Sequence, residues 1–462
     1  TTDDDVAGFT IAETGGSTSV AESGTTDTFT VVLDAKPATD VVLTITSDDT
    51  GEATVTSQLD FTSANWDTPQ TVTVTGVDDD IIDGTITSTL TISIVGAASD
   101  NDFDGVDDQT VSVTTADDDV AGFTIAETGG STSVSESGTT DTFTVVLDAE
   151  PATDVVLTIT SDDTGEANVT STLTFTSANW DTAQTVTITG ADDDLVDGTI
   201  TSTITVTVDD SNSDNDFDGV DDQTVSVTTT DDDVAGFTIV ETGGSTSVAE
   251  SGTTDTFTVV LDAEPATNVV LAVTSSDTGE ATVHGSSVNN NSLTFNSSNW
   301  DTPQSFTVTG VDDDLVDGTV SSTLTVTIVD TLSDASFDSV IDQTVSATTS
   351  DDDVAGFTIA ETGGSTSVAE SGSTDTFTVV LDAQPTSDVV LSIASNDTGE
   401  SSVPSGLTFT PANWDTAQTV TVTGVDDDII DGTQTSSLTI AVDDSNSDND
   451  FDSVLDQTVS VT

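Results

Sequence analysis

The sequence predicts an all-β protein made of four tandem immunoglobulin-like β-sandwich modules arranged end to end. Three observations lead to this fold class. The string DDDVAGFTI begins at Asp3, Asp117, Asp231 and Asp351, which gives periods of 114, 114 and 120 residues. Short runs alternate apolar residues with threonine, as strands with one buried face do. Gly, Asp, Asn and Ser separate these runs, and no stretch has the spacing of an amphipathic helix.

The repeat also sets the module boundaries. Its length is that of a single domain and far exceeds that of a solenoid unit. We therefore expect modules at 6–119, 120–233, 234–353 and 354–462, with 1–5 as the end of a preceding repeat. The third module carries an insert near 284–291. Joined tail to head, the two ends of the chain read VSVTTTDDD, as residues 225–233 do. We therefore expect the sequence to be a segment of a longer array. The terminal Asp triad of the fourth module would then lie beyond this segment.

Within the first module, the alternation predicts about seven strands. The run TFTVVLD at 28–34 places Phe29, Val31 and Leu33 on one face and threonines on the other. Seven short alternating strands in a domain of this length are typical of an immunoglobulin-like sandwich. The predicted strands are a first strand split between 9–11 and 17–22, followed by 28–34, 41–47, 59–62, 71–76, 85–95 and 109–115.

The charge balance excludes several classes of function. The 462 residues include 86 Asp and Glu against a single lysine, Lys36, so the formal net charge is −85. A protein that binds nucleic acid or an anionic membrane needs a basic patch on its surface, and one lysine cannot supply such a patch. No apolar run approaches the roughly 18 residues of a membrane helix, and no signal peptide is recognised. Cysteine is absent, so no disulfide holds the fold together. With a single lysine in the chain, whatever offsets the negative charge must come from outside it.

Most of the carboxylates are concentrated in the same loops of every module. Four of the acidic groups in the first module bear on the site: Glu22, the stretch from Asp48 to Glu52, the stretch 78–83 and the triad 117–119. Alternate loops share a pole in an up-and-down sandwich, so we expect the four groups to converge. Clustered carboxylates without a cation repel one another and are best tolerated around a metal. Several carboxylates in flexible loops favour Ca²⁺, and zinc is excluded by the lack of Cys and the single His.

These loops carry a resemblance to tandem Calx-beta domains, which occur in sodium–calcium exchangers and in long bacterial surface proteins. The matching motifs are VAES at 20–23, TSDDTGEA at 46–53, TVTGVDDDIID at 73–83 and DDDVAGFTI at 117–125. The resemblance implies Calx-beta-like modules that bind calcium at these loops. One departure concerns Ile86, because the family often supplies an acid three residues after the position of Asp83.

The resemblance implies a ligand set in each module. In the first module it is Glu22, Asp49, Asp78, Asp79, Asp83, Asp117, Asp118 and Asp119. In the second it is Glu136, Asp163, Asp192, Asp193, Asp197, Asp231, Asp232 and Asp233. In the third it is Glu250, Asp277, Asp312, Asp313, Asp317, Asp351, Asp352 and Asp353. In the fourth it is Glu370, Asp397, Asp426, Asp427 and Asp431, while Asp3, Asp4 and Asp5 belong to the preceding repeat.

A second acidic loop, DNDFDGVDD at 100–108, leaves two interpretations open. Its first six residues fit the D-x-D-x-D-G opening of a calcium loop, but the twelfth position is Val111 and not Glu. The third module loses one acid and the glycine of this motif. The loop is therefore either a second calcium site or an ordinary Asp-rich hairpin.

These observations predict a calcium-binding extracellular array, stiffened by Ca²⁺ at its junctions and forming a surface filament or an adhesin stalk. Copies would join head to tail, with Asp3–Asp5 of one unit completing the last site of its neighbour. One alternative is a module that recognises a glycan or a surface. Another is an acidic halophile protein without specific calcium sites. We do not expect an enzyme, because no recurring His or Lys is available to activate the abundant serines.

Overall fold

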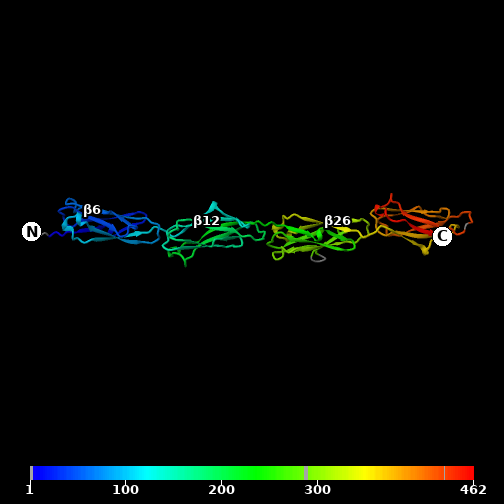
Figure 1. Ribbon diagram of the computed structural model, residues 1–462, viewed down its shortest axis with the longest axis horizontal. Helices are drawn as coiled ribbons and strands as arrows, with labels where there is room; N and C mark the ends of the chain where they lie inside the picture. The colour runs from blue at the N-terminus through cyan, green and yellow to red at the C-terminus, as the bar shows by residue number, and fades with distance from the viewer. Residues whose placement is uncertain (1–3, 286–289, 431) are drawn as a thin grey trace. The chain divides into compact units, whose positions relative to one another are not determined.

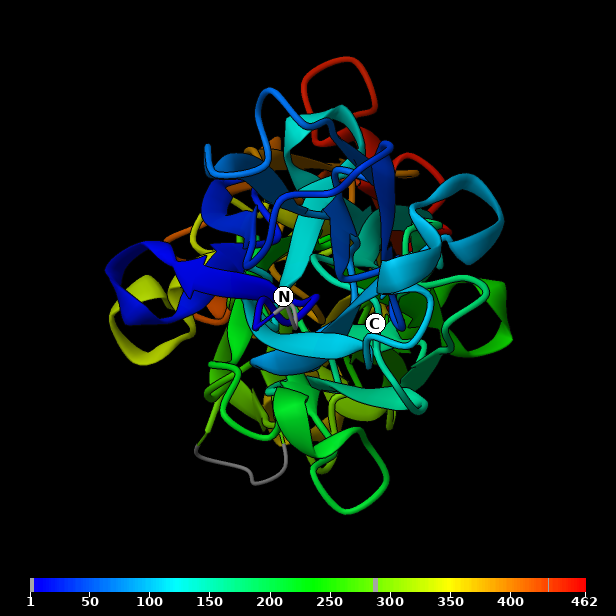
Figure 2. The same cartoon turned by 90° about the vertical axis from the view of Figure 1, so that its left-hand side faces the viewer.

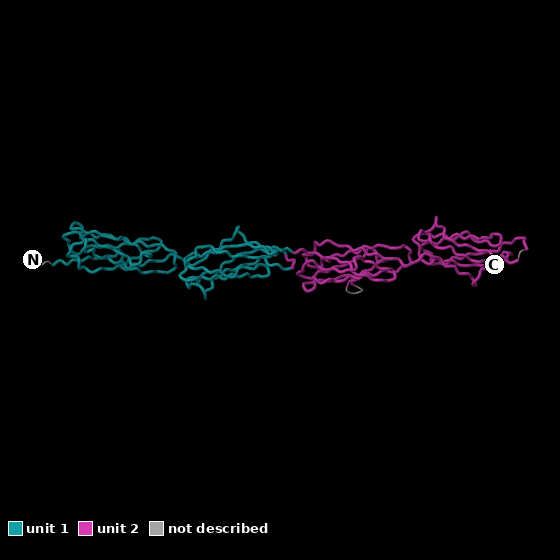
Figure 3. The backbone as a smooth tube through the Cα atoms, viewed as in Figure 1, with its two compact units in different colours: residues 1–193, 198–232 teal, residues 194–197, 233–462 magenta. Residues whose placement is uncertain are grey.

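A computed structural model describes residues 4–285, 290–430 and 432–462. The ribbon consists of strands joined by loops and short 3₁₀ turns (Figure 1, Figure 2). The chain divides into two compact units (Figure 3). Unit 1 contains residues 1–193 and 198–232, and unit 2 contains residues 194–197 and 233–462. In the described part of the chain, no helix is long and apolar enough to cross a membrane.

Unit 1 contains the strands of the first two repeats. Those of the first repeat are β1 (Phe9–Glu13), β2 (Thr18–Ala21), β3 (Thr26–Leu33), β4 (Val41–Ser47), β5 (Ala53–Val55), β6 (Gln58–Phe61), β7 (Gln70–Gly76), β8 (Ile86–Ile94) and β9 (Gln109–Ala116). Those of the second are β10 (Phe123–Glu127), β11 (Thr132–Ser135), β12 (Thr140–Leu147), β13 (Val155–Ser161), β14 (Ala167–Val169), β15 (Thr172–Phe175), β16 (Gln184–Gly190), β17 (Ile200–Val208) and β18 (Gln223–Thr230).

Unit 2 contains the strands of the last two repeats. Those of the third repeat are β19 (Phe237–Glu241), β20 (Thr246–Ala249), β21 (Thr254–Leu261), β22 (Val269–Ser275), β23 (Ala281–His284), β24 (Ser292–Phe295), β25 (Gln304–Gly310), β26 (Thr319–Ile328) and β27 (Gln343–Ser350). Those of the fourth are β28 (Phe357–Glu361), β29 (Thr374–Leu381), β30 (Val389–Ser395), β31 (Ser401–Ser402), β32 (Gly406–Phe409), β33 (Gln418–Gly424), β34 (Ser436–Val442) and β35 (Gln457–Val461).

Short 3₁₀ helices lie in the loops of both units. In unit 1 they are η1 (Thr14–Gly16), η2 (Gly96–Ala98), η3 (Asn101–Phe103), η4 (Thr128–Gly130) and η5 (Asn215–Phe217). In unit 2 they are η6 (Thr242–Gly244), η7 (Asp330–Leu332), η8 (Ala335–Phe337), η9 (Thr362–Gly364) and η10 (Asn449–Phe451).

Each repeat forms a two-sheet sandwich, so the predicted all-β fold of tandem immunoglobulin-like domains is confirmed. In the first repeat, one sheet has the order β1-β3-β7-β5 and the other has the order β2-β9-β8-β4-β6. The alternating pattern buries Phe29, Val31 and Leu33 of β3, as expected. Four separate clusters of buried apolar residues form the cores, one for each repeat.

The topology brings the acidic loops to one pole, although not in the up-and-down order that we expected. Strand β2 runs parallel to β9, β9 is antiparallel to β8, and β8 is antiparallel to β4. Strands β2, β4 and β9 therefore end at the same pole. The end of β7 joins them, because Ala53 pairs with Gly76 just after the β4 turn. The loops after β2, β4, β7 and β9 consequently face a common space.

Gly76 at the end of β7 makes this convergence sterically possible. A Cβ atom at this position would lie 2.0 Å from the backbone oxygen of Ala21 at the end of β2. No side chain fits such a contact, so β7 can approach β2 closely only with glycine here. Gly190 and Gly310 meet the same close approach in the second and third repeats.

Candidate metal centre

Glu22, directly after β2, is the most deeply buried acid of the first repeat. Its side chain is 1% exposed, and neither carboxylate oxygen has a hydrogen-bond partner. A buried carboxylate normally accepts several hydrogen bonds or pairs with a cation, because isolated burial of its charge is very costly. The fold therefore places an uncompensated negative charge at the pole where the acidic loops meet.

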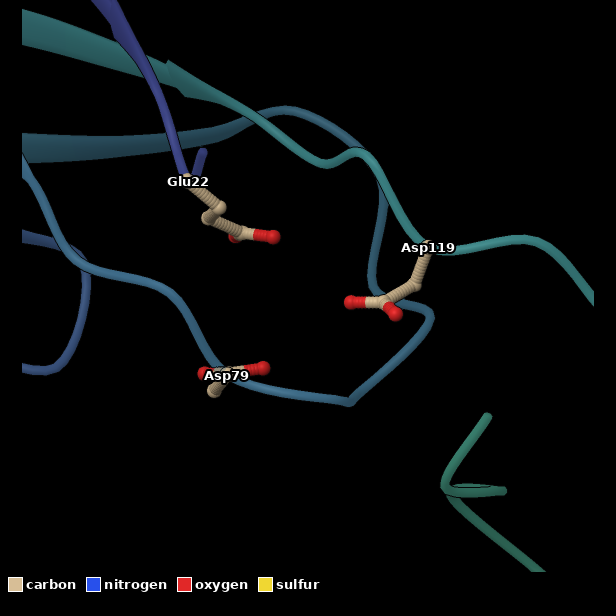
Figure 4. A group of neighbouring side chains, drawn as sticks. All are labelled: Glu22, Asp79 and Asp119. Carbon is tan, nitrogen blue, oxygen red and sulfur yellow. The ribbon is translucent and has the colours of Figure 1, made fainter. Parts of the chain in front are cut away.

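Two aspartates from different loops share this space with Glu22. Asp79 comes from the loop after β7, and Asp119 follows β9. One carboxylate oxygen from each of the three side chains lies within 4.8 Å of the other two. Figure 4 shows the three carboxylates pointing toward one another across the gap between their loops. This is an all-oxygen donor set at a spacing that a single cation can bridge.

A second group of three also includes Glu22. Glu52 and Asp83 also hold carboxylate oxygens within 4.8 Å of Glu22 and of each other. Glu52 is only 6% exposed, and its Oε2 has no hydrogen-bond partner. Glu22 therefore belongs to both groups, so that two donor sets meet at one buried carboxylate.

Glu52 was not among the ligands that the resemblance implied. The sequence did contain a signal for it, because the glutamate of TSDDTGEA recurs at Glu166, Glu280 and Glu400. We placed the ligand of this loop at Asp49 instead. Asp49 is exposed, and its Oδ1 accepts a hydrogen bond from the N–H of Gly51 at 3.0 Å. That carboxylate shapes the turn that carries Glu52 inward.

Burial and mutual repulsion raise the pKa values of the clustered acids. Burial is the largest cause at Glu22, whose pKa rises to about 7, and the nearby charges of Asp117 and Glu52 add to it. Burial followed by the charge of Asp83 raises the pKa of Glu52. Burial and the charge of Asp79 raise that of Asp83. Raised pKa values of this kind mean that these acids either hold protons more readily or gain from a nearby cation.

The remaining predicted residues of the first repeat frame these two groups. Asp117 accepts hydrogen bonds through Oδ2 from the backbone N–H groups of Asp83 and Gly84, at 3.1 and 2.8 Å. Its Oδ1 accepts from the N–H of Asp119 at 2.7 Å. Asp117 thus ties the loop after β7 to the terminal triad. Asp78 and Asp118 are exposed and lie outside the two groups.

The third repeat, which lies in unit 2, has the same kind of centre. Glu250 is 1% exposed, and both of its carboxylate oxygens lack a hydrogen-bond partner. It forms a group within 4.8 Å with Asp351 and Asp353. Burial and then the charge of Asp351 raise its pKa to about 7. Glu280 is buried close by, and its pKa is raised by burial and by the charge of Asp317.

Other predicted ligands of the third repeat lie on its surface. Asp277 makes the same turn as Asp49, accepting from the N–H of Gly279 at 2.9 Å. Asp312, Asp313 and Asp352 are exposed.

The second and fourth repeats contain parts of the same arrangement of acids. In unit 1, Glu136 and Glu166 are buried, and Asp163 makes the exposed turn. Asp231 is half-buried. The exposed acids are Asp192, Asp193 and Asp232. Asp197 and Asp233, both half-buried, belong to unit 2.

In the fourth repeat, Glu370 and Glu400 line a cavity of about 420 Å³. Asp397 and Asp426 are exposed and Asp427 is half-buried, whereas Asp431 lies outside the described residues.

The second acidic loop has a different character. Asp100 is 7% exposed, and its Oδ2 accepts from the backbone N–H groups of Ala38 and Thr39, at 2.6 and 2.9 Å. Its Oδ1 caps η3 through the N–H of Asp102. Hydrogen bonds from the backbone lower the pKa of Asp100. This carboxylate is therefore satisfied by the protein itself, which favours the hairpin interpretation over a second calcium site.

The loop that carries Asp79 and Asp83 also contacts the following repeat within unit 1. Ile82 packs against the core of the second repeat. The backbone N–H of Glu150 donates to the carbonyl of Asp80 at 2.7 Å, and Ile81 forms a parallel bridge with Glu150. The candidate metal loop is therefore also the contact surface between two repeats.

Comparison with solved structures finds similar chains at low sequence identity and low TM-score. No family model and no curated protein sequence matches this chain. The calcium binding domain CBD12 of CALX1.1 is 15% identical, covering 43% of this chain and 80% of that one, with a TM-score of 0.21. Domains 4–9 of the surface layer protein SbsC are 15% identical, covering 98% and 65%, with a TM-score of 0.22. The human desmocollin-1 ectodomain is 11% identical, covering 100% and 78%, with a TM-score of 0.24. Membership of the Calx-beta family stays a prediction.

Proposed function

We propose that this chain is a calcium-binding structural array, in which Ca²⁺ occupies the acidic pole of each sandwich. The observation that carries the proposal is Glu22, a buried carboxylate without a hydrogen-bond partner that lies in two groups of converging acids. Ca²⁺ takes six to eight oxygen ligands, including carboxylates in flexible loops. In the first repeat Glu22, Glu52, Asp79, Asp83 and Asp119 would hold the metal and the metal would neutralise their charge.

The role that we propose for calcium is mechanical. Asp79 and Asp83 sit on the loop whose Ile82 packs against the next repeat, and Asp119 is followed almost directly by β10. A cation bound to these three carboxylates would restrict the motion of the two segments that connect the repeats, namely the loop after β7 and the segment between β9 and β10. The protein would then work as an extracellular spacer, in a surface filament or an adhesin stalk, and not as an enzyme.

Assembly of copies head to tail belongs to the same proposal. Glu370 and Glu400 line an open cavity in the fourth repeat, and the triad Asp3–Asp5 of a second copy would add carboxylates to it. Asp4 and Asp5 are exposed, whereas Asp3 lies outside the described residues. An interface of this type has no symmetry that closes it and therefore propagates as a fibre.

Titration of the calcium-free chain with Ca²⁺ by isothermal calorimetry, at low and at molar NaCl, tests the proposal. We expect saturable binding that survives molar NaCl, because several ligands are buried and poorly screened. Binding that disappears at high salt would instead support the alternative of an acidic halophile protein with diffuse counter-ions. The glycan-recognition alternative has less support, because the repeats carry near-identical poles.

A further inference from the structure

Ser88 carries a buried hydroxyl near the acidic pole of the first repeat that the metal centre does not use. Its side chain is 2% exposed, and its Oγ has no hydrogen-bond partner among the residues that the structure describes. The equivalent Ser202 and Ser322 are each 1% exposed, and their Oγ atoms are unpartnered within the same described ranges. A buried hydroxyl without a partner costs stability. Its recurrence in three repeats therefore indicates a role beyond packing.

The position of Ser88 is directly beneath the clustered carboxylates. Strand β8 begins at the acidic pole, and Ser88 is its first buried residue counted from that pole. The last buried residue of the neighbouring β9 is Thr115, whose Oγ1 donates to the backbone carbonyl of Glu52 at 3.5 Å. Ser88 pairs with Val113, two residues before Thr115, so both hydroxyls point into the same interior layer.

The fourth repeat shows which way this hydroxyl points. Ser436 occupies the position of Ser88 there, and its Oγ lies 2.7 Å from the Oγ of Ser401. Ser401 in turn occupies the position of Ala53, the residue directly after Glu52. The serine of β8 thus faces the strand of the opposite sheet that follows Glu52. Because the side chain of Ala53 offers no oxygen, the hydroxyl of Ser88 is left to serve the adjacent glutamate.

We propose that Ser88, Ser202 and Ser322 are positioning residues of the calcium centres. When a cation holds the ionised carboxylates, the hydroxyl of Ser88 donates to Oε2 of Glu52, a buried atom that also has no partner in the described part of the chain. This leaves Oε1 of Glu52 for the cation. A hydrogen bond to an ionised carboxylate is stronger than one between neutral groups, so the serine favours the loaded centre over the calcium-free one. The inference rests on the proposed calcium function and deepens it.

Calcium binding to the full chain with Ala in place of the three buried serines tests the inference. Isothermal calorimetry should show an average affinity about tenfold weaker, the loss expected for one hydrogen bond to a charged group. Urea denaturation in EGTA should show that the calcium-free chain is as stable as before or more stable, because an unpartnered buried hydroxyl has been removed. The matched control, which should change neither quantity, places Ala at the exposed serines of the neighbouring strands, Ser112, Ser226 and Ser346.

Threonine at the three buried positions supplies a second variant that keeps the hydroxyl. It should bind calcium more tightly than the alanine variant does. An alanine variant that binds calcium like the unmodified chain, or that is less stable in EGTA, would show that the serines only fill space and would overturn the inference. An unmodified chain that binds no calcium would overturn the proposed function together with it, so the two failures are distinguishable.

Discussion

Glu22 and Glu52, from loops 30 residues apart in the sequence, place buried carboxylate oxygens within 4.8 Å of each other. Neither Glu22 oxygen nor Oε2 of Glu52 has a hydrogen-bond partner. Two negative charges held this close in a poorly solvated space repel strongly. The calcium-free fold must therefore carry protons at this pole or lose stability, and a divalent cation removes the conflict.

Calcium should stabilise the chain far more than an equal ionic strength of NaCl. A ligand that binds only the folded state at 100-fold above its Kd contributes about 2.7 kcal/mol per site. Screening by sodium acts on the exposed charges, but it acts weakly on the buried pair. Differential scanning calorimetry with CaCl₂ and with matched NaCl measures the difference. Equal increases in Tm would mean that screening alone explains the effect.

Replacing the buried glutamates should separate charge repulsion from metal binding. With Gln at Glu22, Glu136, Glu250 and the half-buried Glu370, the calcium-free chain should become more stable, by about 1–3 kcal/mol for each of the three buried charges removed. The calcium-induced rise in Tm should be largely lost. The control is Asp67→Asn together with the equivalent substitution in each other repeat. It removes the same net charge at an exposed position. A quadruple variant that keeps the full calcium response would contradict the assignment of these residues.

The calcium-free chain should be less stable at pH 8 than at pH 5. The pKa values of Glu22 and Glu250 rise to about 7 in the folded state from 4.5. The folded state therefore holds more protons, and its stability falls as pH rises through that interval. Each group should contribute on the order of 1–3 kcal/mol. Urea denaturation in EGTA at both pH values measures the difference in the free energy of unfolding. Greater stability at pH 8 would show that these two glutamates do not dominate the pH dependence of stability.

Asp100 should behave as a structural residue. Asp100→Asn removes an acceptor for the backbone N–H groups of Ala38 and Thr39 and should cost about 1–3 kcal/mol. The number of bound calcium ions should not change. Asp104→Asn, in the same loop, serves as the comparison because its side chain is exposed. Loss of one calcium per substituted repeat would instead revive the second-site interpretation.

Removing calcium should loosen the connection between repeats. The loop that carries Asp79 and Asp83 also places Ile82 against the next core, so repulsion in the emptied cluster should detach this contact. Small-angle scattering in Ca²⁺ and in EGTA should show a broader distribution of chain dimensions after chelation. Identical scattering curves would mean that the metal does not control the junctions.

The alternation of Val, Leu, Ile and Phe with Thr was enough to predict most strands, because each strand buries one face. It missed β5 (Ala53–Val55), which is too short for an alternating pattern and is set by its pairing with Gly76. The acidic loops were also found from the sequence. The burial of the Glu52 carboxylate beside Glu22 was not predicted, because it depends on which way a turn directs each carboxylate. That direction is fixed by the hydrogen bond from Gly51 to Asp49.

If Ca²⁺ compensates the buried carboxylates, it should stay bound to the chain when free metal is removed, and the bound ions can be counted. The chain is equilibrated with micromolar Ca²⁺ in molar NaCl, separated from free metal by gel filtration, and analysed by inductively coupled plasma mass spectrometry. Each of the first three repeats contains a buried glutamate and a terminal triad within the chain. We expect at least one retained calcium ion for each of these repeats. A chain that emerges free of calcium and still folded would contradict it.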